Sequence, residues 1–136
     1  MFGEDCKLRR SHKFEETMIW GKDRRADIME KKILDELVKG VLCIFQNSVV
    51  QIILYGSVAR GTNTEESDVD VAILMNSAMD EVSEELLSDF IVDMNLKYDK
   101  VFSVIDIEYD LFQKWENVIP FYNNVAKEGV VLWKAA

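Results

Sequence analysis

Along this 136-residue sequence, short runs rich in β-branched residues alternate with longer segments whose apolar residues recur at helical spacing. This alternation restricts the fold to one that contains both helices and strands. Residues 23–45 carry apolar side chains at three- and four-residue steps, a pattern that predicts an amphipathic helix. Residues 49–55 are rich in β-branched side chains and are followed by a Gly-Ser pair, which predicts a buried strand. We therefore expect an α+β domain in which helices pack on a small mixed β-sheet.

The rest of the chain continues this alternation. Pro120 separates the last two predicted helices, because proline is not tolerated in a helix interior. Residues 1–22 show no clear period and are expected to form a loosely ordered N-terminal extension, which leaves 23–136 as the domain. The further predicted elements are strands at 68–75, 101–107 and 130–133, and helices at 79–98, 110–118 and 121–128.

Charge and composition exclude several classes of protein. A net charge of −9 argues against non-specific binding to nucleic acid, which needs Lys and Arg to displace counterions from phosphates. No apolar run approaches the ~18 residues that a membrane-spanning helix requires. The N-terminal residues lack the apolar region of a secretory signal, and the two cysteines have no metal-ligand spacing. A cytoplasmic protein is expected.

An Asp-x-Asp pair stands at the start of the second predicted strand. Because residues two apart on a strand point to the same face, Asp68 and Asp70 are expected to project side by side, with Val69 on the opposite face. A divalent cation relieves the repulsion between such neighbouring charges. Mg²⁺ favours one or two carboxylates together with substrate phosphates, and two ions about 4 Å apart can clamp a phosphoryl displacement. The alternative is a solvated start of a strand.

A Gly-Ser turn closes the first predicted strand. Glycine at position 56 lets backbone amides approach a phosphate without an intervening Cβ, and Ser57 adds a hydroxyl donor. If a helix starts just after the turn, its N–H groups favour an anion there. The alternative is an ordinary turn at the end of a strand.

A third carboxylate lies within the third predicted strand. Asp106 interrupts an otherwise apolar run, and a charge in such a run is seldom present unless it is paired or bound to a metal. If this strand neighbours the one that carries Asp68, Asp106 would complete a three-carboxylate site. It would then bind the ion that activates an acceptor hydroxyl, or take the hydroxyl proton itself. Glu108 and Asp110 compete for this role, although exposure at the strand end is their simpler explanation.

These motifs resemble those of a known family. A Gly-Ser pair, ten intervening residues and Asp-x-Asp resemble the signature of the DNA polymerase β-like nucleotidyltransferases. Residues 56–61 (Gly-Ser-Val-Ala-Arg-Gly) and 67–71 (Ser-Asp-Val-Asp-Val) are similar to the minimal nucleotidyltransferases, called MNT proteins, and so is the tail at 124–133. The resemblance covers about residues 30–133, while the N-terminal extension has no match.

The resemblance implies a fold, a site and a partner. The fold would be the nucleotidyltransferase fold, with ATP as substrate and Mg²⁺ as cofactor, and the partner would be a toxin of the HEPN type. An MNT protein of such a pair acts as an antitoxin and can attach AMP to a tyrosine of the toxin. Carried over to this sequence, the resemblance assigns Mg²⁺ to Asp68, Asp70 and Asp106, and the triphosphate to Gly56, Ser57 and Arg60.

The length of the chain also bears on the acceptor. Little sequence follows the third predicted strand to build an acceptor pocket, so we expect another chain to supply the acceptor. Two alternatives stay open at this point. The protein could neutralise its partner by contact alone, or it could modify a small molecule in the manner of an aminoglycoside nucleotidyltransferase.

Overall fold

The computed structural model describes residues 28–61 and 68–135. The predicted extension at residues 1–22, the predicted helix start at 23–27 and Ser67 of the second motif lie outside these ranges. Within them, helices and strands follow one another in the predicted order, and a short helix is added directly after the first strand.

Four strands form one mixed sheet in the order β3-β2-β1-β4. The central strand β1 (Val49–Tyr55) runs antiparallel to β2 (Val69–Met75) and to β4 (Val130–Lys134). β3 (Phe102–Glu108) lies parallel to β2 at the edge of the sheet. The predicted α+β class with a small mixed sheet is therefore confirmed.

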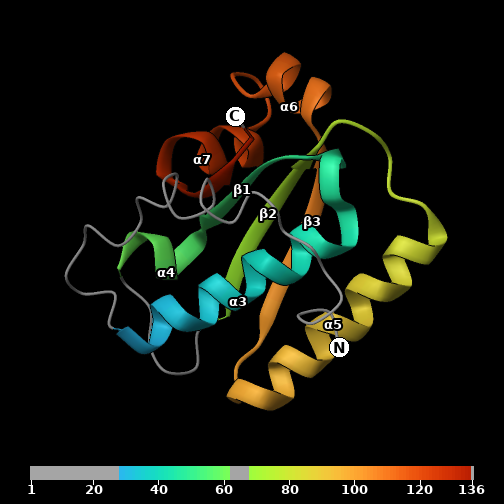
Figure 1. Cartoon of the computed structure of the whole chain (residues 1–136). Helices are drawn as coiled ribbons and strands as arrows, with labels where there is room; N and C mark the ends of the chain where they lie inside the picture. Colours follow the sequence, from blue (N-terminus) through green and yellow to red (C-terminus); the bar gives the residue numbers. More distant parts are fainter. Residues whose placement is uncertain (1–27, 62–67, 136) are drawn as a thin grey trace.

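Helices cover both faces of the sheet (Figure 1). On the face that we call the α3/α5 face, α3 (Ile28–Phe45) and α5 (Glu81–Tyr98) pack over the larger hydrophobic cluster. The opposite α6/α7 face has a smaller cluster, to which α6 (Tyr109–Trp115) and α7 (Pro120–Glu128) contribute. A further helix, α4 (Gly56–Arg60), begins directly after β1 and contacts β2 and α7.

The two helices of the α3/α5 face approach each other closely. A Cβ at Gly40 on α3 would overlap the ring of Phe90 on α5, so this crossing requires a glycine. Leu37, one turn before Gly40, and Val41, the next residue, are fully buried in the same cluster. The predicted apolar stripe of the first helix therefore packs against the sheet and α5 together.

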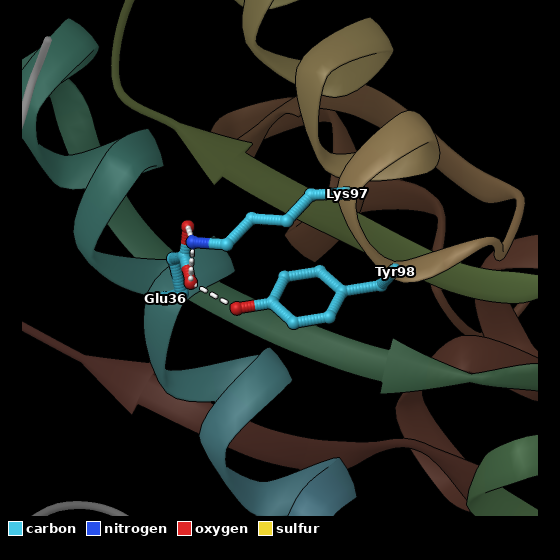
Figure 2. Close-up of polar contacts among 3 residues, drawn as sticks. All are labelled: Glu36, Lys97 and Tyr98. Atoms are coloured by element: carbon cyan, nitrogen blue, oxygen red, sulfur yellow. Dashed lines mark hydrogen bonds and ion pairs between the residues drawn. The ribbon is translucent and has the colours of Figure 1, made fainter.

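A polar contact joins the same two helices at the surface. Figure 2 shows Glu36 of α3 facing Lys97 and Tyr98 of α5. Lys97 Nζ donates hydrogen bonds to both carboxylate oxygens of Glu36, at 3.2 and 3.0 Å, and the Tyr98 hydroxyl donates to Oε1. Burial acts to raise the pKa of Glu36, but the hydrogen bonds from Tyr98 and Lys97 outweigh it and leave that pKa below its usual value.

Pro120 is the first residue of α7 and not a spacer before it. Proline fits this position because the first N–H groups of a helix have no partner within the helix. The predicted boundary was therefore displaced by one residue for a simple physical reason.

Two observations concern the predicted cellular setting. No helix in the described ranges is long and apolar enough to cross a membrane. Cys43 on α3 is half-buried and disulfide-bonded, and the other cysteine, Cys6, lies outside the described residues.

Candidate functional site

The Asp-x-Asp pair lies where β2 begins, on the α6/α7 side of the sheet. Asp68 directly precedes the strand and is exposed, while Asp70 is its second residue and is half-buried. Further along β2, Ala72 and Leu74 have the same parity as Asp70 and pack in the smaller cluster of the α6/α7 face. Asp70 therefore projects toward that face, and Asp68, two residues earlier, is close enough for its charge to act on the Asp70 carboxylate.

The Gly-Ser turn lies against the second aspartate. Tyr55, the last residue of β1, is in register with Asp70 of β2, and α4 starts at the next residue. A Cβ at position 56 would overlap Oδ2 of Asp70, and Gly56 has a φ of 81°, which side chains rarely tolerate. Position 56 therefore needs glycine for both its backbone angle and the space that the carboxylate fills. The fold brings together two motifs that are separated by ten residues in sequence.

The electrostatics of the site centre on Asp70. Burial raises the pKa of Asp70, the neighbouring charge of Asp68 raises it further, and the positive charge of Arg60 lowers it in part. The pKa of Tyr55 is raised as well, by burial and by the charge of Asp70. A carboxylate that burial and a like charge both disfavour is well placed to gain from a bound cation.

Arg60 is fixed by an ion pair with the last helix. Its Nη1 donates to Oε1 of Glu128 on α7 at 3.2 Å, with both side chains about half exposed. The ion pair holds the end of α4 beside α7 and leaves the guanidinium close enough to Asp70 to act on its pKa. The sequence contained no signal for Glu128 as the partner of Arg60.

The structure contradicts the prediction that Asp106 completes a three-carboxylate site. β3 does neighbour β2, as that prediction required, but Asp106 is in register with Ile73, three residues beyond Asp70. Side chains an odd number of residues apart on a strand point to opposite faces of the sheet. Asp106 therefore lies on the face opposite Asp70, together with Phe102 and Val104 of the α3/α5 cluster. The side chain of Asp106 is exposed there. Its competitor Glu108 has the same parity and is exposed too.

The register places Ser103 beside Asp70 instead. Ser103 is half-buried and shares its face with Ile105, which packs against the cluster of the α6/α7 face. Sequence reasoning missed Ser103 and Tyr55, because neither residue type stands out alone and only strand register shows that both flank Asp70.

The donor set at this site fits a hard divalent cation such as Mg²⁺. Mg²⁺ is usually held by one or two carboxylates, with substrate phosphates and water completing its coordination. Asp68 and Asp70 supply such a pair, and the space at Gly56 leaves room for the Asp70 carboxylate. Among the described residues, no group of three or more His, Cys, Asp and Glu side chains could hold a metal ion. A bound nucleotide would therefore have to contribute the remaining ligands.

A small mixed sheet that holds a Gly-Ser turn against a pair of aspartates is the arrangement expected of a nucleotidyltransferase. Comparison with known proteins agrees. The family described as "Nucleotidyltransferase domain" matches residues 31–128, and the chain belongs to this family.

Two curated relatives come from Methanocaldococcus jannaschii. One, named "Putative protein adenylyltransferase MJ0604", is 36% identical over 104 residues, which span 76% of this chain and 98% of the relative. The other, named "Putative protein adenylyltransferase MJ0141", is 35% identical over 74 residues, or 54% of this chain and 75% of the relative.

Solved structures share the fold at lower sequence identity. A crystal structure of a toxin-antitoxin with AMP-PNP has a TM-score of 0.51 and 23% identity, with 74% of this chain and 73% of that chain covered. A crystal structure of a mutant of the toxin-antitoxin MntA-HpeT has a TM-score of 0.50 and 21% identity, with the same coverage of both chains. These similarities confirm the predicted nucleotidyltransferase fold.

Proposed function

We propose that this nucleotidyltransferase transfers AMP from ATP, with Mg²⁺, to a hydroxyl group of a partner protein, and that the partner is a toxin of the HEPN type that the transfer neutralises. The observation that carries the proposal is the contact between the Asp70 carboxylate and the backbone at Gly56. This contact joins a candidate cation site to a candidate phosphate site on one face of the sheet.

The residues around this contact have separate roles in the proposed reaction. Asp68 and Asp70 would hold the cation, which neutralises charge on the triphosphate when it is bound. Ser57 and the first N–H groups of α4 would donate to phosphate oxygens, because the first N–H groups of a helix have no partner within the helix. Arg60 would offer a positive charge to the same phosphates beside its ion pair with Glu128.

The transfer itself needs few further groups. The acceptor oxygen forms a bond to the α-phosphorus, the bond from that phosphorus to the bridging oxygen breaks, pyrophosphate leaves, and the hydroxyl proton is lost to water. Such reactions depend mainly on positioning and charge neutralisation. We do not include Asp106 in this scheme, because it lies on the opposite face of the sheet.

The proposal of a protein acceptor rests on the names of the relatives and of the structures of similar fold. Two curated relatives are named as protein adenylyltransferases, and two structures of similar fold are toxin-antitoxin structures, one of them with AMP-PNP. Attached AMP would add negative charge and bulk to the partner. Both would disturb an RNA-binding cleft of a ribonuclease toxin.

The test is incubation of this protein with the product of its neighbouring gene, ATP and Mg²⁺, followed by intact-mass spectrometry. We expect the partner to gain one or more AMP units, and we expect the gain to disappear with the double variant Asp68→Asn/Asp70→Asn. An equal gain with the double variant would overturn the catalytic assignment. Neutralisation of the toxin that survives the double change without any gain in mass would favour neutralisation by contact.

A second variant separates the phosphate site from the cation site. Ser57→Ala removes one hydroxyl donor, and loss of a hydrogen bond to a charged group costs about 1.5–3 kcal/mol. Titration calorimetry with AMP-PNP should show a binding free energy that is weaker by about this amount, while the folded fraction of the protein stays unchanged. An unaltered affinity would place the phosphates elsewhere.

A further inference from the structure

We propose that Ser103 is the third side chain of the cation site, and that it supplies a neutral hydroxyl where Asp106 was predicted to supply a carboxylate. This inference rests on the proposed function of the Asp68 and Asp70 pair and extends it to β3. The site would then hold its cation with two negative charges from the chain instead of three.

Strand register is the first argument for Ser103. β2 and β3 are parallel, and Ser103 is the residue of β3 in register with Asp70. Neighbouring strands lie about 4.8 Å apart, and paired residues point to the same face. The Ser103 side chain therefore emerges beside the Asp70 carboxylate on the α6/α7 face, close to the end of the strand where Asp68 is also found.

The second argument is the chemical character of β3 on this face. The other β3 residues that point the same way are Ile105 and Ile107, which pack with the apolar cluster there. Ser103 is therefore a polar residue in an apolar row, and it is half-buried. The Ser103 hydroxyl is not sealed from solvent, because the buried side-chain atoms without a partner in the described part of the chain do not include it. A cation at Asp70, or a water molecule bound to that cation, could therefore reach the hydroxyl.

The third argument is the contrast with Asp106. Asp106 stands three residues further along β3, in register with Ile73, and it is exposed on the α3/α5 side. The parallel register thus leaves Ser103 as the residue of β3 that pairs with an aspartate of the site. A hydroxyl is a weaker ligand than a carboxylate, so binding of the cation should depend strongly on the phosphates of a bound nucleotide.

The first experiment adds the missing charge. Mg²⁺ titrations of the nucleotide-free protein, followed by thermal unfolding, would compare the wild type with Ser103→Asp. We expect Ser103→Asp to bind Mg²⁺ about tenfold more tightly or better, the scale on which groups around a metal change its affinity. The matched control is Asn117→Asp, which adds the same charge at an exposed turn between α6 and α7. It should leave Mg²⁺ affinity nearly unchanged.

The second experiment detects direct contact by a change in metal preference. Thiolate is a soft ligand that favours Cd²⁺ over Mg²⁺. Cd²⁺ should therefore stabilise Ser103→Cys more than it stabilises the wild type at the same Cd²⁺ concentration. The wild type serves as the control for any effect of Cd²⁺ on Cys6 and Cys43. A purely structural role of Ser103 would change stability without changing this preference.

The outcomes distinguish the two proposals. Equal Mg²⁺ responses of Ser103→Asp and Asn117→Asp, together with no gain in Cd²⁺ preference for Ser103→Cys, would overturn the role of Ser103. If Asp70→Asn still abolished stabilisation by Mg²⁺ and AMP-PNP in that case, the proposed function would stand without Ser103. If Ser103→Asp did not fold, the Cd²⁺ measurement alone would decide, because a thiol is close in size to the hydroxyl that it replaces.

Discussion

The two faces of the interior strand β2 differ in what they contribute to the protein. On the α3/α5 face, Val69, Val71, Ile73 and Met75 are all apolar and buried. On the α6/α7 face, Ala72 and Leu74 are buried as well, but Asp70 at the start of the strand is charged, half-buried and in contact with Gly56. One face therefore contributes mainly to stability, while the other combines a small core with a charged end that carries the candidate site.

The largest effect on stability is expected on the α3/α5 face. Leu37 of α3 is fully buried, and replacing a buried leucine with alanine costs about 2–5 kcal/mol. Chemical denaturation of Leu37→Ala should show a loss of this size, whereas the fraction that remains folded should bind AMP-PNP as the wild type does. A loss of nucleotide affinity without a loss of stability would contradict the division between the two faces.

A smaller effect on stability, combined with loss of the site, is expected at Gly56. Alanine there would have a φ near 81° and would displace the Asp70 carboxylate, and backbone strain of this kind costs about 1–3 kcal/mol. Gly61, at the other end of α4, has a φ of 78° and is the matched control for backbone strain. Gly56→Ala and Gly61→Ala should lose similar stability in urea titrations, but only Gly56→Ala should lose its stabilisation by Mg²⁺ and AMP-PNP.

The smallest effect is expected at the polar contact between α3 and α5. The pKa of Glu36 is lower in the folded state than its usual value of 4.5. The ionised carboxylate therefore stabilises the fold fully at a pH above 4.5, and this stabilisation is lost as the pH falls through the lowered pKa. Exposed ion pairs contribute about 0.2–1 kcal/mol. Urea titrations should find Glu36→Gln less stable than the wild type by this amount at pH 7, with the difference vanishing at low pH. A difference that grew toward low pH would contradict the assigned direction of the shift.

Much of the fold could be predicted because local patterns determine it. The apolar stripe that ends at Phe45 and the β-branched run at 49–55 both formed the expected elements. The sequence left open whether a helix starts at the Gly-Ser turn, and the structure has one there, α4, which begins at Gly56 itself. In these segments, neighbouring residues in sequence carry enough information to specify the structure.

The candidate site could be predicted only in part, because strand register is a property of two strands together. The two-residue spacing of Asp68 and Asp70 can be read from a single strand, and the structure places Asp70 on the face of Ala72 and Leu74. The position of Asp106 relative to Asp70 depends on how β3 aligns with β2, and a register shifted by one residue reverses the face of every side chain. Residue type alone therefore favoured Asp106, while the alignment of the strands places Ser103 beside Asp70.

The central claim is that the site lies on the α6/α7 face and depends on Asp70 and not on Asp106. The most direct test is thermal unfolding with and without Mg²⁺ and AMP-PNP, comparing the wild type, Asp70→Asn and Asp106→Asn. A ligand at 100 times its dissociation constant stabilises the folded state by about 2.7 kcal/mol. We predict this stabilisation for the wild type and for Asp106→Asn, and none for Asp70→Asn. Retention of the shift in Asp70→Asn, or its loss in Asp106→Asn, would contradict the account.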